Sequence, residues 1–412
     1  MKRETWRRFG RLSLSLLLLW AVEPGVKAHP DRSPVISFPD QTPPRGSAAN
    51  SGPLDPVPDD RLLEPSHRFP KPPLEHLKKC FAYVHALSEK AYHNNGVWAD
   101  HDPKRLASLP EASRPLNVID PKFPPLYRNT AWRLIGYEQA YLAGKDKIYL
   151  ERIRAGADYL VREQRPDGSF LYWRGRDDGW PNSPHLLFCT ASPGCALLDA
   201  YRIAGEKKYL EAALKTAEWL VKADVSPNNN YNSFAVWNLC EIYRETKDTR
   251  FLENAIEKTV RGVYPNQLSN GAWAGHNSWI FYHSIIIRGF AALFGVLPDG
   301  HQEKPELRRR LVRAINHLTV EQRANGFLRS CFDGEEWGKS RLPGNAYSVH
   351  REEKVCPFAI HALICVLKWT DLDVRDLLHG LLSAPPQDEL VQGQEGMMHL
   401  AYGAALAWRA GE

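Results

Sequence analysis

The stretch from Asn270 to Ile287 gathers, within one short segment, side chains that could transfer protons and bind a sugar. It begins as a Gly-rich turn and continues as an apolar helix, and Asn277 and Ser278 fall where a helix N-cap is expected. Trp279 and His283 are four residues apart and would share one helix face, with Tyr282 beside them. A histidine or a tyrosine can act as a general acid or base, and an amide can donate to a developing negative charge. The alternative is a capped core helix whose His and Tyr side chains only pack.

Other segments that lead into apolar helices combine aromatic and charged side chains. Pyranose rings present apolar faces to aromatic rings, and their hydroxyls need fixed donors and acceptors, so this combination is typical of a sugar site. An aromatic residue can also simply cover a helix end, which is the expected role of Phe170 and Trp273. The residues expected to bind substrate are Arg128, Trp173, Arg174, Trp180, His185, Tyr231, His276, Trp279, Arg341, His350 and Glu352.

One chemistry that fits these residues is that of a lyase. A lyase removes the proton α to the carboxylate of a uronic acid, so it needs a neutral donor or an arginine at that carboxylate. It also needs a base and an acid for the leaving oxygen. Asn277, Tyr282 and His283 match these roles, and one of the loop arginines would add positive charge at the carboxylate.

A hydrolase would instead place two carboxyl groups across the glycosidic bond, one protonated and one ionised. One of Asp177 and Asp178 could supply the first, and one of Glu352 and Glu353 the second. Neighbouring acids raise one another's pKa, which would keep one group protonated. A third possibility is a protein that binds glycans without cleaving them, and in all three cases the partner is a polysaccharide or oligosaccharide. The catalytic candidates are Asn277, Tyr282, His283 and Asp178.

The elements that would position these residues are helices of two alternating kinds, from Leu74 onward. Amphipathic, charge-rich segments cover a core with one face, whereas apolar segments must be buried nearly all round. Six of each, strictly alternating, predict an all-α (α/α)6 toroid over residues 74–412. The expected outer helices are 74–93, 147–164, 206–223, 249–264, 305–323 and 373–384, and the expected inner helices are 126–142, 184–204, 231–245, 279–295, 354–369 and 397–410.

A turn signal recurs where outer helices end. Asp or Asn followed by Gly permits a positive-φ turn, and the residue two positions on can pack against the helix ends. The turns resemble the QW-type motif of the terpenoid-cyclase and prenyltransferase toroids and the similar turns of helical-barrel glycan enzymes. This resemblance implies a toroid without choosing its chemistry. The copies are Gln164-x-x-Asp167-Gly168-x-Phe170, Gln267-x-x-Asn270-Gly271-x-Trp273, Gln322-x-x-Asn325-Gly326-x-Leu328 and the shorter Asn95-Gly96-x-Trp98.

Two of these toroid classes are disfavoured by the sequence. The run Asp371-Leu372-Asp373 lacks the last carboxylate of the DxDD cluster with which terpenoid cyclases protonate an alkene, and no prenyltransferase-type zinc site can be assembled. The segment from His276 to Trp279, by contrast, resembles the Asn/His/aromatic helix motif of helical-barrel alginate- and chondroitin-type polysaccharide lyases. That resemblance implies cleavage of a uronic-acid-containing glycan by β-elimination. No CxxC or HExxH motif supports a metal site, and no cofactor is expected.

The first 73 residues are expected to lie outside the toroid. Residues 1–28 have a basic start, an apolar run and a small-residue cleavage site, which predict a secretory signal peptide and a secreted or periplasmic protein without a stable membrane anchor. They also hold +4 of the net charge of +5, so the basic pI does not indicate nucleic-acid binding. Residues 29–73 are rich in Pro, Ser and Asp and are expected to form a disordered linker. In an oxidising compartment Cys189 and Cys195 could pair.

Overall fold

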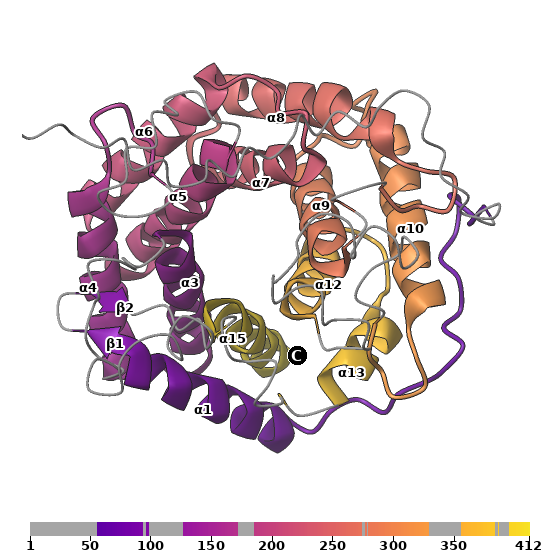
Figure 1. Cartoon of the computed structure of the whole chain (residues 1–412), viewed down its shortest axis with the longest axis horizontal. Helices are drawn as coiled ribbons and strands as arrows, with labels where there is room; N and C mark the ends of the chain where they lie inside the picture. Colours follow the sequence, from indigo (N-terminus) through magenta and orange to yellow (C-terminus); the bar gives the residue numbers. More distant parts are fainter. Residues whose placement is uncertain are drawn as a thin grey trace, which may run out of the picture. The chain divides into compact units, whose positions relative to one another are not determined.

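Helices provide nearly all of the regular structure in the part of the chain that the structure describes (Figure 1). The computed structural model describes residues 56–93, 96–98, 127–171, 185–273, 277, 279–328, 356–383, 386 and 395–412. All of them belong to the unit Thr42–Glu412. In the described residues, twelve α-helices alternate between an inner and an outer ring, which confirms the predicted all-α (α/α)6 toroid.

Each predicted helix has a counterpart at almost the predicted position. The inner helices are α3 (Tyr127–Gly144), α5 (His185–Ala204), α7 (Asn229–Thr246), α9 (Ile280–Phe294), α12 (Pro357–Trp369) and α15 (Glu395–Gly411). The outer helices are α1 (Leu74–Ala91), α4 (Lys147–Glu163), α6 (Lys207–Lys222), α8 (Thr249–Gly262), α10 (Lys304–Glu321) and α13 (Arg375–Ser383). The short strands β1 (Tyr92–His93) and β2 (Val97–Trp98) form an antiparallel pair, and the 3-10 helix η2 (Tyr264–Asn266) follows α8.

The two rings differ in burial, as their sequence patterns require. Every residue of α7 from Asn229 to Ile242 is buried, whereas the outer helix α8 buries a stripe that includes Phe251 and Ala255. Each inner helix packs on the next, and α15 closes the ring by packing on both α12 and α3. At this closing contact a Cβ on Gly403 would lie 2.6 Å from the carbonyl oxygen of Gly136, so the helices approach as closely as glycine permits.

Short turns connect inner helices to the outer helices that follow them. Lys145, Gly205 and Lys247 adopt positive φ values of 57°, 73° and 61° at these points. Asp146 and Asp248 then cap α4 and α8 by accepting from backbone N–H groups at 3.0 and 3.1 Å. Because these turns are short, each outer helix begins at the rim where the preceding inner helix ends. The inner helices therefore begin at the opposite rim.

The recurrent Gln/Gly turn has one geometry in its three complete copies. Gly168, Gly271 and Gly326 have φ values of 92°, 88° and 82°, a region that favours glycine. The Gln side chain closes each turn and also reaches the next outer helix, so the turn joins neighbouring outer helices. Gln164 Nε2 donates to Gly168 O and Ala212 O at 3.1 and 2.8 Å, Gln267 Nε2 to Gly271 O and Arg310 O at 3.3 and 2.9 Å, and Gln322 Nε2 to Gly326 O and Leu377 O at 3.1 and 3.0 Å. Phe170 and Trp273 are fully buried beside these turns.

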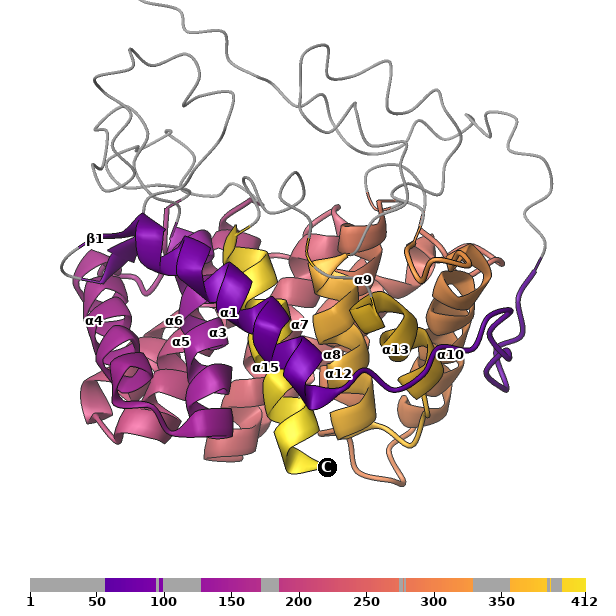
Figure 2. The same ribbon diagram turned by 90° about the horizontal axis from the view of Figure 1, so that it is seen from below.

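The expectation that residues 29–73 form a disordered linker is wrong for residues 56–73, which we call the strap. The strap runs along α13 and α10 before α1 begins (Figure 2). Asn316 of α10 holds it: its Oδ1 accepts from Leu63 N at 2.8 Å, and its Nδ2 donates to Pro58 O and Arg61 O at 2.8 and 2.9 Å. Arg313 adds an ion pair to Asp59 at 2.7 Å. The strap therefore belongs to the outer wall.

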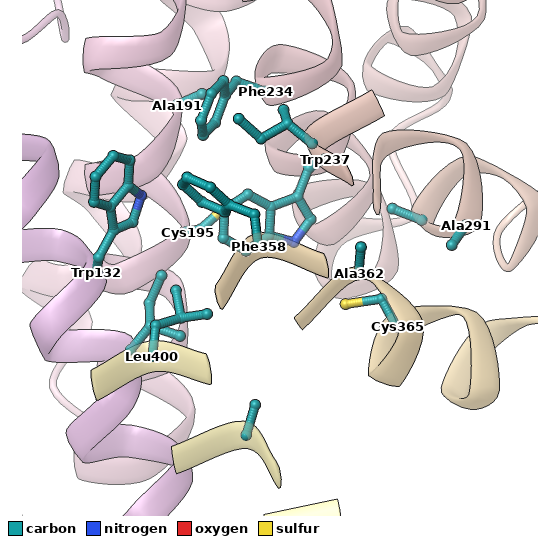
Figure 3. Packing of buried hydrophobic residues seen from close by; sticks show 14 of the residues in the cluster. Trp132, Ala191, Cys195, Phe234, Trp237, Ala291, Phe358, Ala362, Cys365 and Leu400 are labelled. Carbon is teal, nitrogen blue, oxygen red and sulfur yellow. The ribbon is translucent and has the colours of Figure 1, made fainter. Parts of the chain in front are cut away.

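Aromatic and small apolar side chains from several inner helices meet inside the ring (Figure 3). Cys195 is a buried free thiol there, so it forms no disulfide with Cys189. None of the helices described is long and apolar enough to cross a lipid bilayer. Residues 1–28 lie outside the described residues, and the signal peptide stays a prediction.

Candidate active site

The inner helices begin at the rim opposite the turns at Lys145, Gly205 and Lys247 (Figure 2). We call this rim the mouth and define it as the first two turns of the inner helices together with Asn277 and Trp279. Helix N-termini present free N–H groups and partial positive charge, so a rim built from them favours anionic and hydroxyl-rich ligands. Seven predicted site residues fall within these bounds: Arg128, His185, Tyr231, Asn277, Trp279, Tyr282 and His283.

An aromatic and cationic stack occupies the mouth where α3, α5 and α7 begin. The rings of Phe188 and Tyr231 stack with centroids 4.8 Å apart and an interplanar angle of 20°. The Arg128 guanidinium lies 4.7 Å from the Phe188 centroid and 5.6 Å from that of Trp132. Arg128 is half-buried, and the two stacked rings are less than 9% exposed. Two predicted residues, Arg128 and Tyr231, thus lie close together because both contact Phe188.

Three buried asparagines form a hydrogen-bonded cluster, which we call the amide cluster, at the start of α7. The side-chain Nδ2 of Asn230 donates to Asn228 Oδ1 at 2.8 Å and to Asn277 Oδ1 at 2.9 Å. The backbone N–H of Asn230 donates to the same two oxygens at 3.3 and 3.1 Å. Asn228 is also the N-cap of α7. The cluster thereby fixes Asn277, which precedes α9, on the N-terminus of α7.

These contacts determine how the Asn277 amide is oriented. A backbone N–H can only donate, so the atom that accepts from Asn230 must be the amide oxygen of Asn277. The hydrogen bonds of Asn277 to the described residues all use its side-chain oxygen, and the buried atoms Asn228 Nδ2 and Asn230 Oδ1 have no partner there. The amide cluster therefore holds unused donors together with one unused acceptor.

The first turn of α9 carries the phenol of Tyr282. The helix begins at Ile280 with Trp279 at its N-cap, so the expectation that Asn277 would cap it is wrong. The Asn277 oxygen accepts from Asn230 at the start of α7, and the extended Trp279 precedes the first turn of α9. Tyr282 is half-buried and its ring lies 4.3 Å from that of Phe281, centroid to centroid. A partly exposed phenol at the mouth is placed where it could exchange a proton with a ligand.

His283 does not face the mouth, contrary to the prediction that it acts in a solvated groove. It is fully buried, and its Nε2 donates to the carbonyl oxygen of Ala314 in α10 at 3.0 Å. Its ring packs edge-on against Trp273 at 5.2 Å. Burial, together with the nearby His317, lowers the pKa of His283 to about 3. His283 is therefore a neutral structural residue between the two rings.

Most other predicted site residues lie outside the described residues. They are Trp173, Arg174, Asp178, Trp180, His276, Arg341, His350 and Glu352, together with the alternative acids Asp177 and Glu353. His185 begins α5, but its side chain is outside the described part. Where the structure describes side chains, no group of three or more His, Cys, Asp or Glu is placed to hold a metal ion.

Two features of the mouth were missed in the sequence. Phe188, which joins Arg128 to Tyr231, reads as one more apolar residue of an inner helix. Asn228 and Asn230 belong to a run of three asparagines directly after Pro227. Asparagine is favoured at N-caps and can both donate and accept, so this run was the available signal.

Solved structures share this fold at low sequence identity. An unsaturated glucuronyl hydrolase from Streptococcus agalactiae aligns over 86% of this chain and 97% of its own, with a TM-score of 0.56 and 12% identity. A polysaccharide lyase aligns over 81% and 96%, with a TM-score of 0.53 and 13% identity. A glycoside hydrolase of family 76, a mannosidase from Bacteroides thetaiotaomicron, aligns over 81% and 99%, with a TM-score of 0.54 and 11% identity. The chain thus has the (α/α)6 toroid fold that these carbohydrate-active enzymes share.

No protein-family model matches the chain, and no curated protein sequence matches it.

Proposed function

We propose that this protein is a glycan-degrading enzyme that binds its polysaccharide or oligosaccharide substrate at the mouth. The stacked rings of Phe188 and Tyr231, the Arg128 guanidinium and the amide cluster supply the aromatic surface and fixed polar groups that sugars require. The fold relatives include a polysaccharide lyase and two hydrolases, and one structure of the glucuronyl hydrolase is a mutant complexed with dGlcA-GalNAc6S. We further propose that residues 1–28 direct export, which suits an extracellular substrate.

The reaction that we propose is β-elimination on a uronic-acid-containing glycan. The observation that carries this proposal is the fixed Asn277 amide, whose oxygen is held by Asn230 at 2.9 Å so that its Nδ2 is left for a ligand. When the proton α to a carboxylate is removed, negative charge develops on the carboxylate oxygens. A preorganised neutral donor stabilises that charge without reorganising.

The proposed proton transfers use Tyr282. Its phenolate oxygen takes the C5 proton, and the electron pair of that C–H bond forms the C4–C5 double bond as the C4–O4 bond breaks. The phenol then returns the proton to the leaving O4, which restores the phenolate. No water is consumed, and the products are an unsaturated uronate end and a free hydroxyl. Arg128 would bind the acidic group of a neighbouring sugar.

A glycoside hydrolase is the second candidate, because two of the three fold relatives described above are hydrolases. In that case the carboxyl pair would be Asp178 with Glu352, or their neighbours Asp177 and Glu353. A hydrolase adds water across the glycosidic bond and leaves no double bond in the product.

Digestion of uronate polymers and of neutral glycans tests both proposals. Ultraviolet absorbance reports the double bond conjugated to the carboxylate, and a reducing-end assay reports chain cleavage. For β-elimination we expect absorbance and reducing ends to rise together on uronate polymers. Reducing ends without absorbance would overturn β-elimination in favour of hydrolysis. Glycan binding without either product would overturn the enzymatic proposal as a whole.

A further inference from the structure

Arg288 is a buried charge without a hydrogen-bond partner. It lies in the middle of α9 and is 1% exposed, deeper in the toroid than the mouth. None of its three guanidinium nitrogens finds an acceptor in the described part of the chain. Leaving a charged donor unsatisfied in the interior costs several kcal/mol unless something compensates it. The surroundings of Arg288 show how far this compensation goes.

Aromatic rings surround the guanidinium. Its carbon lies 3.8 Å from the centroid of the Trp237 ring, 4.9 Å from that of Phe234 and 5.8 Å from that of Phe358. These rings come from α7 and α12 and gather in the interior of the ring of helices (Figure 3). The attraction between a cation and a ring face is stronger when both are desolvated than at an exposed site. Such contacts engage the faces of the guanidinium and leave its N–H groups without acceptors.

Within the described residues, no carboxylate is among the groups that favour the charged form of Arg288. The ionisable groups that favour the charged form of Arg288 are the thiols of Cys365 and Cys195. Burial raises the pKa of Cys365 to about 12 and that of Cys195 well above its ordinary value, so both thiols are neutral. Burial lowers the pKa of Arg288 only to about 10, so the guanidinium stays charged at neutral pH. The interior here carries one net positive charge.

His361 packs against the same Trp237 ring and has a nitrogen without a partner among the described residues. Its ring lies 5.8 Å from Trp237, the ring on which Arg288 stacks, and its Nε2 lies 3.8 Å from Cys365 Sγ. We assign the thiol as the donor to Nε2, which puts the imidazole proton on Nδ1, and Nδ1 has no partner in the described residues. Burial first, and then the charge of Arg288, lower the pKa of His361 well below its ordinary value. The ring is a neutral donor.

We propose that Arg288 and His361 bind a small monovalent inorganic anion, of the size and chemistry of chloride, inside the ring of helices. The anion accepts from the guanidinium edge and from His361 Nδ1, while Trp237, Phe234 and Phe358 cover the guanidinium faces. The enclosed, largely apolar surroundings and the weakly hydrated guanidinium favour a weakly hydrated halide over sulfate or phosphate. This site is independent of the function proposed for the mouth.

Thermal unfolding of the full chain tests the site. Sodium chloride or bromide replaces sodium gluconate at constant ionic strength, so general screening is unchanged. Bound anion stabilises the folded state by mass action, and we expect the unfolding midpoint to rise by a few degrees and saturate. Arg288→Met should abolish this rise, and Arg250→Met, which removes an exposed arginine from α8, should retain it. The proposal would be overturned if the unfolding midpoint did not change with halide, or if the Arg288→Met variant responded like the unaltered protein.

A second measurement needs no variant. Crystals of the full chain soaked in bromide should show anomalous scattering within hydrogen-bonding distance of the Arg288 guanidinium and His361 Nδ1. Bromide found only on the outer surface would overturn the proposal, whatever the melting experiments show.

Discussion

Two buried polar groups on either side of the start of α9 have opposite properties. In the amide cluster, the side-chain oxygen of Asn277 accepts from Asn230. Its Nδ2 group makes no hydrogen bond to the described residues. On the side toward α10, His283 donates to Ala314 and is covered by Trp273. Both residues are less than 9% exposed, and both come from the same short segment. Burial therefore does not distinguish a binding group from a structural one, whereas the neighbour that each side chain contacts does: Asn277 contacts the start of the inner helix α7, and His283 contacts the outer helix α10.

The position along the helix explains the difference. Successive helical residues are about 100° apart, so Tyr282 and His283 cannot present their side chains to the same neighbour. His283 is directed to the outer ring, while Tyr282 stays half-buried at the mouth. The variants below test whether changes at the mouth lower turnover and whether changes between the inner and outer helices lower stability.

The largest effect is expected for Tyr282→Phe, which removes the proposed acid and base. Turnover should fall by about 10²–10⁴-fold, the usual size of proton-transfer catalysis, with little change in unfolding free energy. Tyr243→Phe, near the opposite end of the inner helix α7, is the matched control and should leave turnover unchanged. Steady-state kinetics beside thermal melts would measure both. Equal turnover in the two variants would remove Tyr282 from the mechanism.

His283→Ala should act on stability instead. It empties a fully buried position and leaves Ala314 O without its donor, so the unfolding free energy should fall by about 2–5 kcal/mol. Turnover per folded molecule should be preserved. His67→Ala, at an exposed position, should change stability by no more than about 0.5 kcal/mol. Lost turnover in a variant that stays fully folded would contradict the structural role.

Asn277→Ala should lower turnover by about 10²–10³-fold, as loss of one preorganised donor does at other sites of charge development. Asn254→Ala is the control, because this amide donates only to Val221 O on the outer wall. If both alanine variants keep full activity on uronate substrates, the carboxylate does not bind at the amide cluster.

Removal of the strap should destabilise the outer ring of helices. A chain that begins at Pro70 loses three hydrogen bonds to Asn316 and the ion pair to Arg313, while one that begins at Pro56 keeps them. At roughly 1 kcal/mol per hydrogen bond we expect a loss of about 2–4 kcal/mol for the shorter chain. Denaturant titration of the two chains measures the difference, and indistinguishable midpoints would show that the strap contributes no stability.

Acid should lower the free energy of unfolding gradually, because His283 is buried in its neutral form. The pKa of His283 is about 3 in the folded protein and 6.5 ordinarily, so between these values the unfolded chain binds the extra proton. The stability that the neutral His283 contributes is fully present above pH 6.5. It is lost as the pH falls toward 3, by about 1.4 kcal/mol of unfolding free energy per pH unit. His361 and His399, whose pKa values are also lowered by burial, add to the same slope. His283→Gln should flatten the pH dependence of unfolding, and an unchanged slope would contradict the buried neutral state.

The sequence predicted the twelve helices because the pattern that separates inner from outer helices is local and repeats six times. The strap was not predictable in the same way, since a Pro-rich segment has no periodicity and its partner Asn316 lies about 250 residues away in sequence. The direction of the His283 side chain was equally unpredictable. Helix spacing places His283 on the same face as Trp279, but it does not show whether that face contacts the outer helices or the mouth. Arg288, in an otherwise apolar inner helix, could be recognised as unusual only once its neighbours were known.

The most direct test of the central claim, that substrate binds at the mouth through the amide cluster, is a crystal structure of Tyr282→Phe with a uronate oligosaccharide. This variant should bind substrate without turning it over. We expect a uronate carboxylate within hydrogen-bonding distance of Asn277 Nδ2 and a sugar ring beside Phe188 and Tyr231. A saccharide bound at the opposite rim, near the turns at Gly205 and Lys247, would contradict the account.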